Sequence, residues 1–108
     1  MEIVVSSEGA PVLADPEDFR SFRVVVPKAA APSVVSAALD VIGRSDDGGH
    51  VFVEPRWILE QVPTLAVDIG WRQRFDGMLS YAASQGWTDP DGRVRAHIEY
   101  VVADQQPS

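Results

Sequence analysis

The clearest pattern in the chain is a strict alternation of apolar and polar residues across residues 93–102. Such alternation is typical of a β-strand with one face on a core and the other exposed. The predicted inner face holds Val94, Ala96, Ile98, Tyr100 and Val102, and the predicted outer face holds Arg93, Arg95, His97 and Glu99. Shorter β-branched runs predict further strands at residues 2–5, 22–27 and 50–54. Residues 11–14 could form a hairpin with the strand at residues 2–5.

A helical pattern covers residues 31–43, where apolar residues recur at positions i, i+3, i+4 and i+7. Pro32 suits the first position of this helix, and Gly43 suits a left-handed residue at its end. Because Val34, Ala37 and Val41 are apolar as well, we expect the helix to be covered on more than one side.

A second helix is predicted from about Asp68 to Gln85, with apolar residues confined to an arc of about 100°. This apolar arc contains Trp71, Phe75, Met78, Leu79 and Ala82. Gly86 is predicted to end the helix at positive φ, which turns Trp87 back against the last helical turn. The sequence DPDG at residues 89–92 then favours a type I turn.

Two segments are harder to interpret. Asp15 and Pro16 resemble the N-cap and first position of a helix, although only a turn or so can follow before the strand at 22–27. Residues 54–63 fit either a short helix begun by Pro55 or a continuation of the preceding strand. The order strand, helix, strand over residues 22–54 suggests a βαβ unit with two parallel strands.

Together these elements predict a single α+β domain over residues 1–108, with residues 103–108 as a frayed tail. We expect a single-layer mixed sheet of three to five strands with two main helices packed on one face. With 45% hydrophobic and 23% charged residues, the composition is that of a globular domain.

The net charge of −7 lowers the expectation of nucleic acid or anionic membrane as a partner and favours basic protein partners. The absence of cysteine excludes disulfides, thiolate metal sites and a cysteine nucleophile. No apolar run reaches the length of about 20 residues that a membrane span needs, and the N-terminus lacks signal-peptide features. A cytoplasmic location is therefore expected.

The outer face of the last strand is the candidate site for chemistry. Arg93 and Arg95 are suited to holding an anionic ligand, and His97 and Glu99 could form a proton-transfer pair. The alternative is that these four residues are simply the solvent-facing side of a half-buried strand.

A metal site was also considered. If the strand at residues 50–54 lay beside the last strand, His50, Glu54, His97 and Glu99 could converge as nitrogen and oxygen ligands. No HxH or HExxH spacing supports this arrangement, and the acidic run at 45–49 lacks the later ligands of a calcium loop. We therefore expect no metal and no cofactor.

The aromatic residues give the candidate partner surface. Trp71 and Phe75, with Trp57 nearby, would form such a surface if the sheet does not cover them, and core otherwise. The favoured function is a non-catalytic module that binds a partner protein or self-associates through its aromatic helix or an open sheet edge. The alternative is a small enzyme or ligand-binding protein that uses His97 as acid or base, so whether the protein is an enzyme stays open.

Overall fold

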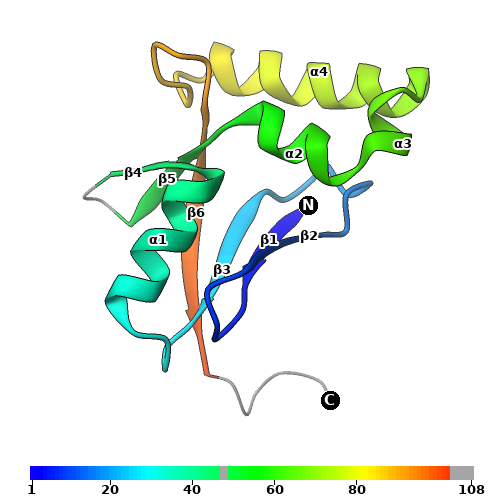
Figure 1. Cartoon of the computed structure of the whole chain (residues 1–108). Helices are drawn as coiled ribbons and strands as arrows, with labels where there is room; N and C mark the ends of the chain where they lie inside the picture. Colours follow the sequence, from blue (N-terminus) through cyan, green and yellow to red (C-terminus); the bar gives the residue numbers. More distant parts are fainter. Residues whose placement is uncertain (47–48, 103–108) are drawn as a thin grey trace.

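The computed structural model describes residues 1–46 and 49–102, and in this part of the chain six strands and four helices form a mixed α+β fold (Figure 1). The strands are β1 (Glu2–Val5), β2 (Pro11–Ala14), β3 (Arg23–Pro27), β4 (Gly43–Ser45), β5 (His50–Val53) and β6 (Val94–Val101). The helices are α1 (Pro32–Ile42), α2 (Pro55–Gln61), α3 (Pro63–Ala66) and α4 (Ile69–Ser84). The expected three to five strands and two main helices were too few, because β4, α2 and α3 are only three to seven residues long and repeat no apolar pattern that would identify them.

The strand order is β2-β1-β3-β6-β5-β4. The adjacent strands β1, β3 and β6 are parallel, whereas β2 pairs antiparallel with β1, and β5 pairs antiparallel with both β6 and β4. The expected parallel pairing of β3 with β5 was wrong. The chain turns back through β4 after α1, so β5 runs antiparallel to β6, which separates it from β3.

The two faces of the sheet differ. The core face consists of side chains that are buried and in register across the strands, and all four helices contribute to the same apolar cluster with it. Its members include Ile3, Val5, Val24, Val26, Val51, Val53, Val94, Ala96 and Ile98. The alternate positions form the other face, called the open face below, and no helix of the described residues packs on it.

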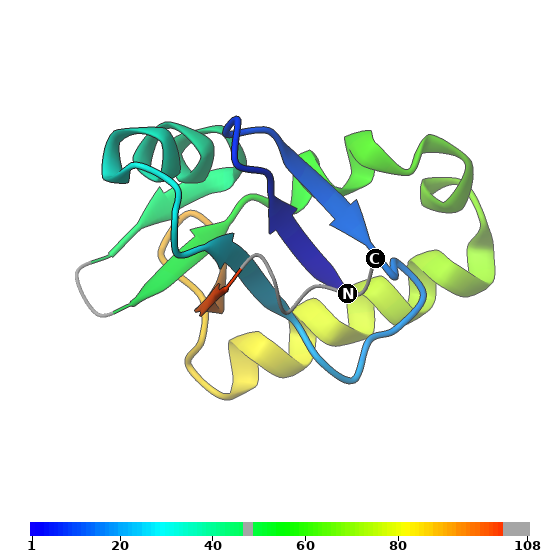
Figure 2. The ribbon, with the colours of Figure 1, turned by 90° about the horizontal axis from the view of Figure 1, so that it is seen from below.

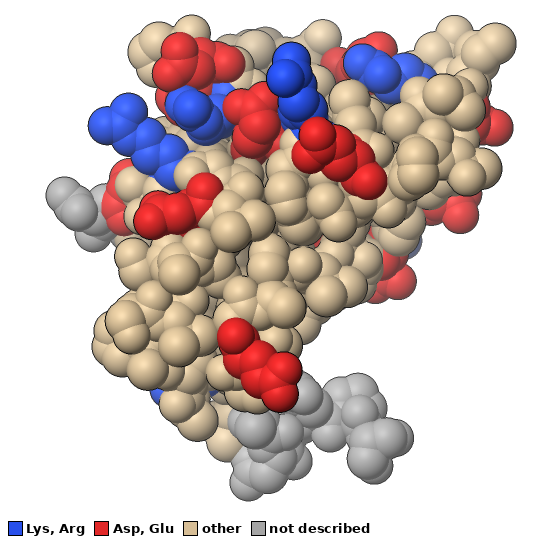
Figure 3. All heavy atoms as spheres, viewed as in Figure 1, with Lys and Arg blue, Asp and Glu red and all other residues tan. Residues whose placement is uncertain are grey.

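Helix α1 begins at Pro32 and buries Val35, Ala38, Leu39 and Ile42, as predicted. The expectation that it is covered on further sides holds only for Val34, which is partly buried near Gly9. It was wrong for Val41, which is 60% exposed, and for Ala37, which is exposed. In Figure 3 the surface over α1 shows few charges, whereas charged side chains gather over the upper part of the molecule around α2 and α4. Figures 1 and 2 show α1 and α4 well apart, over different parts of the sheet.

Gly43 ends α1 but does not adopt the expected left-handed conformation. Its φ is 169°, which is extended backbone, and it is the first residue of β4. A Cβ atom at this position would lie 1.9 Å from the carbonyl oxygen of Phe52. The glycine is therefore required by the close approach of β4 to β5.

Helix α4 and its ending follow the prediction. The Asp68 side chain caps the helix by accepting a hydrogen bond from the backbone N–H of Trp71 at 2.9 Å. Gly86 has a φ of 76°, and the N–H of Trp87 donates to the carbonyl of Ala82 at 2.9 Å. This is the hydrogen bond of a Schellman ending.

The interpretation of residues 15–18 as a helix start was wrong. Asp15 has a φ of 49°, and a single turn closes with the N–H of Asp18 donating to the carbonyl of Asp15. The next carbonyls are bound by α4 instead of by a following turn. The Trp71 indole donates to Pro16 at 2.8 Å, and Arg74 donates to Glu17 at 2.9 Å.

Of the two interpretations of residues 54–63, the helix begun by Pro55 is confirmed as α2. None of the helices in the described part of the chain is long and apolar enough to cross a membrane. The predicted frayed tail at 103–108 lies outside the described residues.

Candidate functional site

A row of polar side chains crosses the open face of the sheet. Strand register places Glu2 opposite Arg23, Arg23 opposite His97, and His97 opposite His50. Asp46 extends the row, since its N–H donates to the carbonyl of His50 at 3.1 Å. We call this set, Glu2, Arg23, His97, His50 and Asp46, the polar row.

Arg23 binds two carboxylates on this face. Its Nε lies 3.2 Å from Oε1 of Glu2, and its Nη1 lies 3.0 Å from Oε2 of Glu99. The hydrogen bond to Glu2 is the main cause of the raised pKa of Arg23, with the charges of Glu2 and Glu99 adding to it. Glu99 is therefore engaged by Arg23, and the contacts of the described residues do not join it to His97.

The two histidines meet on neighbouring strands. Their ring centroids are 5.7 Å apart and their planes are inclined at 66°. The N–H of Ile98 donates to the carbonyl of Gly49. Gly49 and Ile98, the opposite residues one position away from His50 and His97, are therefore a hydrogen-bonded pair of the antiparallel ladder. His50 and His97 thus occupy a non-hydrogen-bonded position, where the side chains of opposite residues come closest.

The expected arginine pair separates into two different environments. Arg93 contacts Asp89 at 3.1 Å, Asp91 at 3.0 Å and Glu54 at 3.7 Å. Hydrogen bonds to Asp89 and Asp91 raise its pKa. Arg95 is exposed, and no carboxylate of the described residues lies within ion-pair distance of it.

The four residues considered as metal ligands do not converge as a set. Glu54 pairs with Arg93 and Glu99 pairs with Arg23, which leaves the two histidines together without them. Within residues 1–46 and 49–102, no group of three or more His, Asp or Glu side chains is arranged to hold a metal ion.

The three aromatic residues expected at a partner surface lie in the core. Trp57 is 8% exposed, Trp71 is 3% exposed and Phe75 is fully buried. Trp71 stacks on Phe75 with a centroid distance of 5.0 Å. The sheet and the 15–22 segment cover them, so in this fold they stabilise the domain and are not available to a partner.

A different set of aromatic residues lines a surface groove. It has a volume of about 210 Å³ and lies where the end of α4, residues 19–22 and the start of β6 meet. The lining residues are Phe19, Arg20, Phe22, Met78, Tyr81, Ala82, Trp87, Val94 and Arg95. We call this the aromatic groove. Phe19 and Phe22 are about 60 residues away from Tyr81 and Trp87 in the sequence, so no local pattern could have indicated the groove. The sequence indicated Trp87 only as the residue that packs against the end of the helix.

The exposed aromatic rings of the groove are those of Tyr81 and Trp87. Tyr81 is 59% exposed and Trp87 is 37% exposed, and their rings meet edge to face at 5.8 Å. The position of Trp87 is fixed on both sides, since its N–H donates to Ala82 and its carbonyl accepts from the N–H of Arg95. The groove wall is therefore held by backbone hydrogen bonds.

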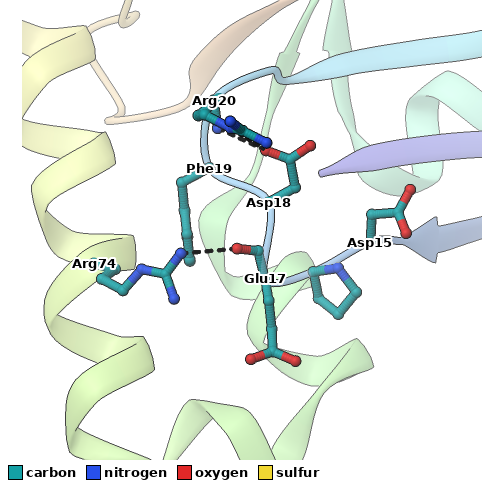
Figure 4. Close-up of a pocket in the computed structure, with 7 residues that line it drawn as sticks. Asp15, Glu17, Asp18, Phe19, Arg20 and Arg74 are labelled. Atoms are coloured by element: carbon teal, nitrogen blue, oxygen red, sulfur yellow. Dashed lines mark hydrogen bonds and ion pairs between the residues drawn. The ribbon is translucent and has the colours of Figure 1, made fainter.

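A wider hollow of about 740 Å³ lies beside the 15–20 segment (Figure 4). Figure 4 shows the carboxylates of Asp15, Glu17 and Asp18 pointing in different directions. Arg74 lies over the ring of Phe19, with 4.8 Å between Cζ and the ring centroid, while it donates to Glu17. These contacts anchor the segment to α4, and the polar groups do not converge on a common point.

Comparisons with known proteins identify no relative: no family model, no curated protein and no solved structure matches the chain.

Proposed function

We propose that this protein is a non-catalytic interaction module that binds a partner protein through the aromatic groove. The observation that carries the proposal is the convergence of Tyr, Trp, Phe, Met and Arg side chains on one hollow. These are the residue types enriched in the binding cores of protein interfaces. The original expectation of an interaction module is kept, but its surface moves from Trp71 and Phe75 to Tyr81 and Trp87.

The lining of the groove indicates the chemistry of the partner. The hollow accommodates a single large apolar side chain between Phe22, Met78 and Trp87. Two guanidinium groups lie at its rim, and neither is firmly paired. Arg95 has no carboxylate partner in the described part of the chain, and the exposed Arg20 is 3.7 Å from Asp18. An acidic group next to the apolar side chain would complement them.

The partner charge favoured by the groove differs from the partner charge favoured by the net charge of the molecule. The net charge of −7 attracts basic partners over long distances, but within the groove the nearest charges are positive. We therefore expect a segment with an apolar anchor flanked by Asp or Glu.

The acid–base alternative at His97 has less support. Its expected orienting group, Glu99, and one of its expected anion-binding groups, Arg93, are both engaged in ion pairs of their own. His97 itself is exposed on an open sheet face. For these reasons we favour the interaction module.

The proposal can be tested with peptides selected from a phage-displayed library on the intact protein. We expect the selected peptides to share an apolar residue beside an acidic one and to shift Trp87 fluorescence to the blue, since Trp57 and Trp71 are already buried. Trp87→Ala and Arg95→Glu should each weaken binding by about thirtyfold, the effect of a binding hot spot.

The matched control is Val67→Ala, because Val67 is 82% exposed and does not line the groove. Peptides that bind the Trp87→Ala and Arg95→Glu variants as well as they bind the parent protein would overturn the proposal, as would a library that yields no binder. Sedimentation of the same variants identifies a second copy as the partner if a dimer forms and Trp87→Ala dissociates it.

A further inference from the structure

We infer that His50 and His97 form a two-histidine chelating site for a divalent transition-metal ion on the open face of the sheet. The site is separate from the aromatic groove, whose lining includes neither histidine. Its success or failure is therefore independent of the proposed function.

The geometry of the pair suits a shared ion. In proteins a zinc ion lies about 2.0–2.1 Å from each imidazole nitrogen, so two rings that share one ion have centroids roughly 5 to 6 Å apart. The observed separation of 5.7 Å falls in this range, with the rings inclined at 66°.

The backbone holds the two histidines in place. They are opposite residues of the antiparallel pair formed by β5 and β6, and this pair lies inside the sheet between β3 and β4. The core faces of both strands are buried, at Val51 next to His50 and at Ala96 and Ile98 beside His97. A ligand pair on such strands is preorganised, because binding does not have to order a loop.

The donor atoms select the class of metal. Two neutral imidazoles suit Zn²⁺, Cu²⁺ and Ni²⁺, whereas Mg²⁺ and Ca²⁺ prefer oxygen ligands. Two protein ligands leave the remaining coordination positions to water or to an added ligand, so the site is an open one. The fold does not depend on it, since the core is formed without any residue of the pair.

The charged groups around the pair balance one another, so the case for a metal ion rests on the geometry and the donor atoms. Arg23 lies next to His97 in the polar row, but Glu2 and Glu99 both neutralise it. On the other side, Asp46 faces His50, and the Oδ1 of Asp46 accepts a hydrogen bond from the backbone N–H of His50 at 3.3 Å. Arg95, two residues before His97, and Arg44, two residues before Asp46, lie on the same face. With Arg23 they make three cations against the three carboxylates.

The test is a titration of the full chain with zinc chloride, followed by NMR of the histidine ring nitrogens and by calorimetry. We expect both rings to respond together and to saturate at one equivalent. His50→Ala and His97→Ala should each weaken zinc binding by at least about tenfold, since even substitutions next to metal ligands have effects of that size. Copper should bind more tightly than zinc, following the usual order of divalent ions.

Both histidines are on the surface, so the variants are expected to fold, and their amide spectra check this directly. Arg95→Gln is the matched control on the same face and should bind zinc at least as well as the parent chain. Zinc binding that is unchanged in either histidine variant would overturn the inference, and so would rings that respond separately or only to an excess of metal. Magnesium chloride should leave both rings unaffected.

Discussion

The two faces of this sheet are built from alternate residues of the same strands, yet they are organised by different forces. On the core face Ile3, Val24 and Ile98 lie in register and are buried in one apolar cluster. One residue earlier, Glu2, Arg23 and His97 lie in register on the open face and are held in part by directional ion pairs. Apolar burial is non-directional and depends on area, whereas a polar contact depends on which strand is the neighbour.

Stability and recognition therefore belong to different faces of the sheet. The core face should account for most of the free energy of folding, because a buried apolar side chain contributes more than an exposed ion pair. The open face and the adjoining aromatic groove hold the side chains that remain available to ligands. The following predictions test this division, in order of decreasing effect on the free energy of unfolding.

The largest effect is expected from Phe75→Ala. Phe75 is fully buried and stacked on Trp71, so its truncation leaves a cavity in the cluster beneath the sheet. We expect a loss of about 3–5 kcal/mol in the free energy of unfolding, measured by urea denaturation. His97→Ala on the open face should change it by less than about 0.5 kcal/mol. Equal losses from the two variants would show that the two faces do not differ as described.

A smaller effect is expected from Gly43→Ala. The added Cβ would lie 1.9 Å from the Phe52 carbonyl oxygen, so β4 must move away from β5. We expect a cost of about 1–3 kcal/mol, together with faster amide hydrogen exchange in β4 and β5. Gly77→Ala is the control, because nothing lies near its Cβ position and alanine favours the helix by about 0.5–1 kcal/mol. A stable Gly43→Ala protein with unchanged exchange would contradict the close approach.

The turn before β6 should have the next largest effect. Asp89 accepts hydrogen bonds from the N–H groups of Asp91 and Arg93 and from the Arg93 guanidinium. Asp89→Ala leaves these donors without their acceptor, and we expect a loss of about 1–2 kcal/mol at neutral pH. Asp91→Ala, which removes a single exposed contact, should cost less. If the two substitutions had the same effect, the hydrogen bonds of Asp89 would not be what stabilises the turn.

The same carboxylate gives a dependence on pH. Partial burial acts to raise the pKa of Asp89, but hydrogen bonds from Arg93 and Asp91 outweigh it and lower the pKa. The carboxylate therefore contributes its stabilisation above its ordinary pKa and loses it as the pH falls through the lowered value, below about pH 4. In Asp89→Asn this part of the acid destabilisation should disappear, as measured by thermal unfolding from pH 7 to pH 2.

The smallest effect is expected from Arg23→Gln. The ion pairs of Arg23 with Glu2 and Glu99 are partly exposed to solvent, so their loss should cost less than about 1 kcal/mol. The difference from the parent protein should shrink further in about 1 M salt, where charges are screened within a few ångströms. A loss as large as that of Phe75→Ala would mean that the polar row, and not the apolar core, holds the strands together.

Most local elements of this protein follow from short-range patterns in its sequence. The spacing of Trp71 and Phe75 predicted the buried side of α4, and Gly86 predicted its end. Alternation predicted the two faces of β6 as far as Ile98, but Tyr100 and Val102, expected on the inner face, are exposed. The sequence could not predict that Asp15 would begin a turn instead of a helix, because α4 binds the carbonyls of Pro16 and Glu17. Local periodicity and capping depend on residues a few positions apart, and these are visible in the chain.

Which of these elements are neighbours depends on the folded chain as a whole. Because β6 lies between β3 and β5, Glu99 forms an ion pair with Arg23, and His97 lies next to His50. The fold also exposes Trp87 beside Arg95 and buries Trp71. Alternation fixes the face on which a side chain lies, but not the strand that will lie across from it. Strand order depends on how all the elements pack around one core. The neighbours of each polar side chain are therefore set only when the whole sheet has formed.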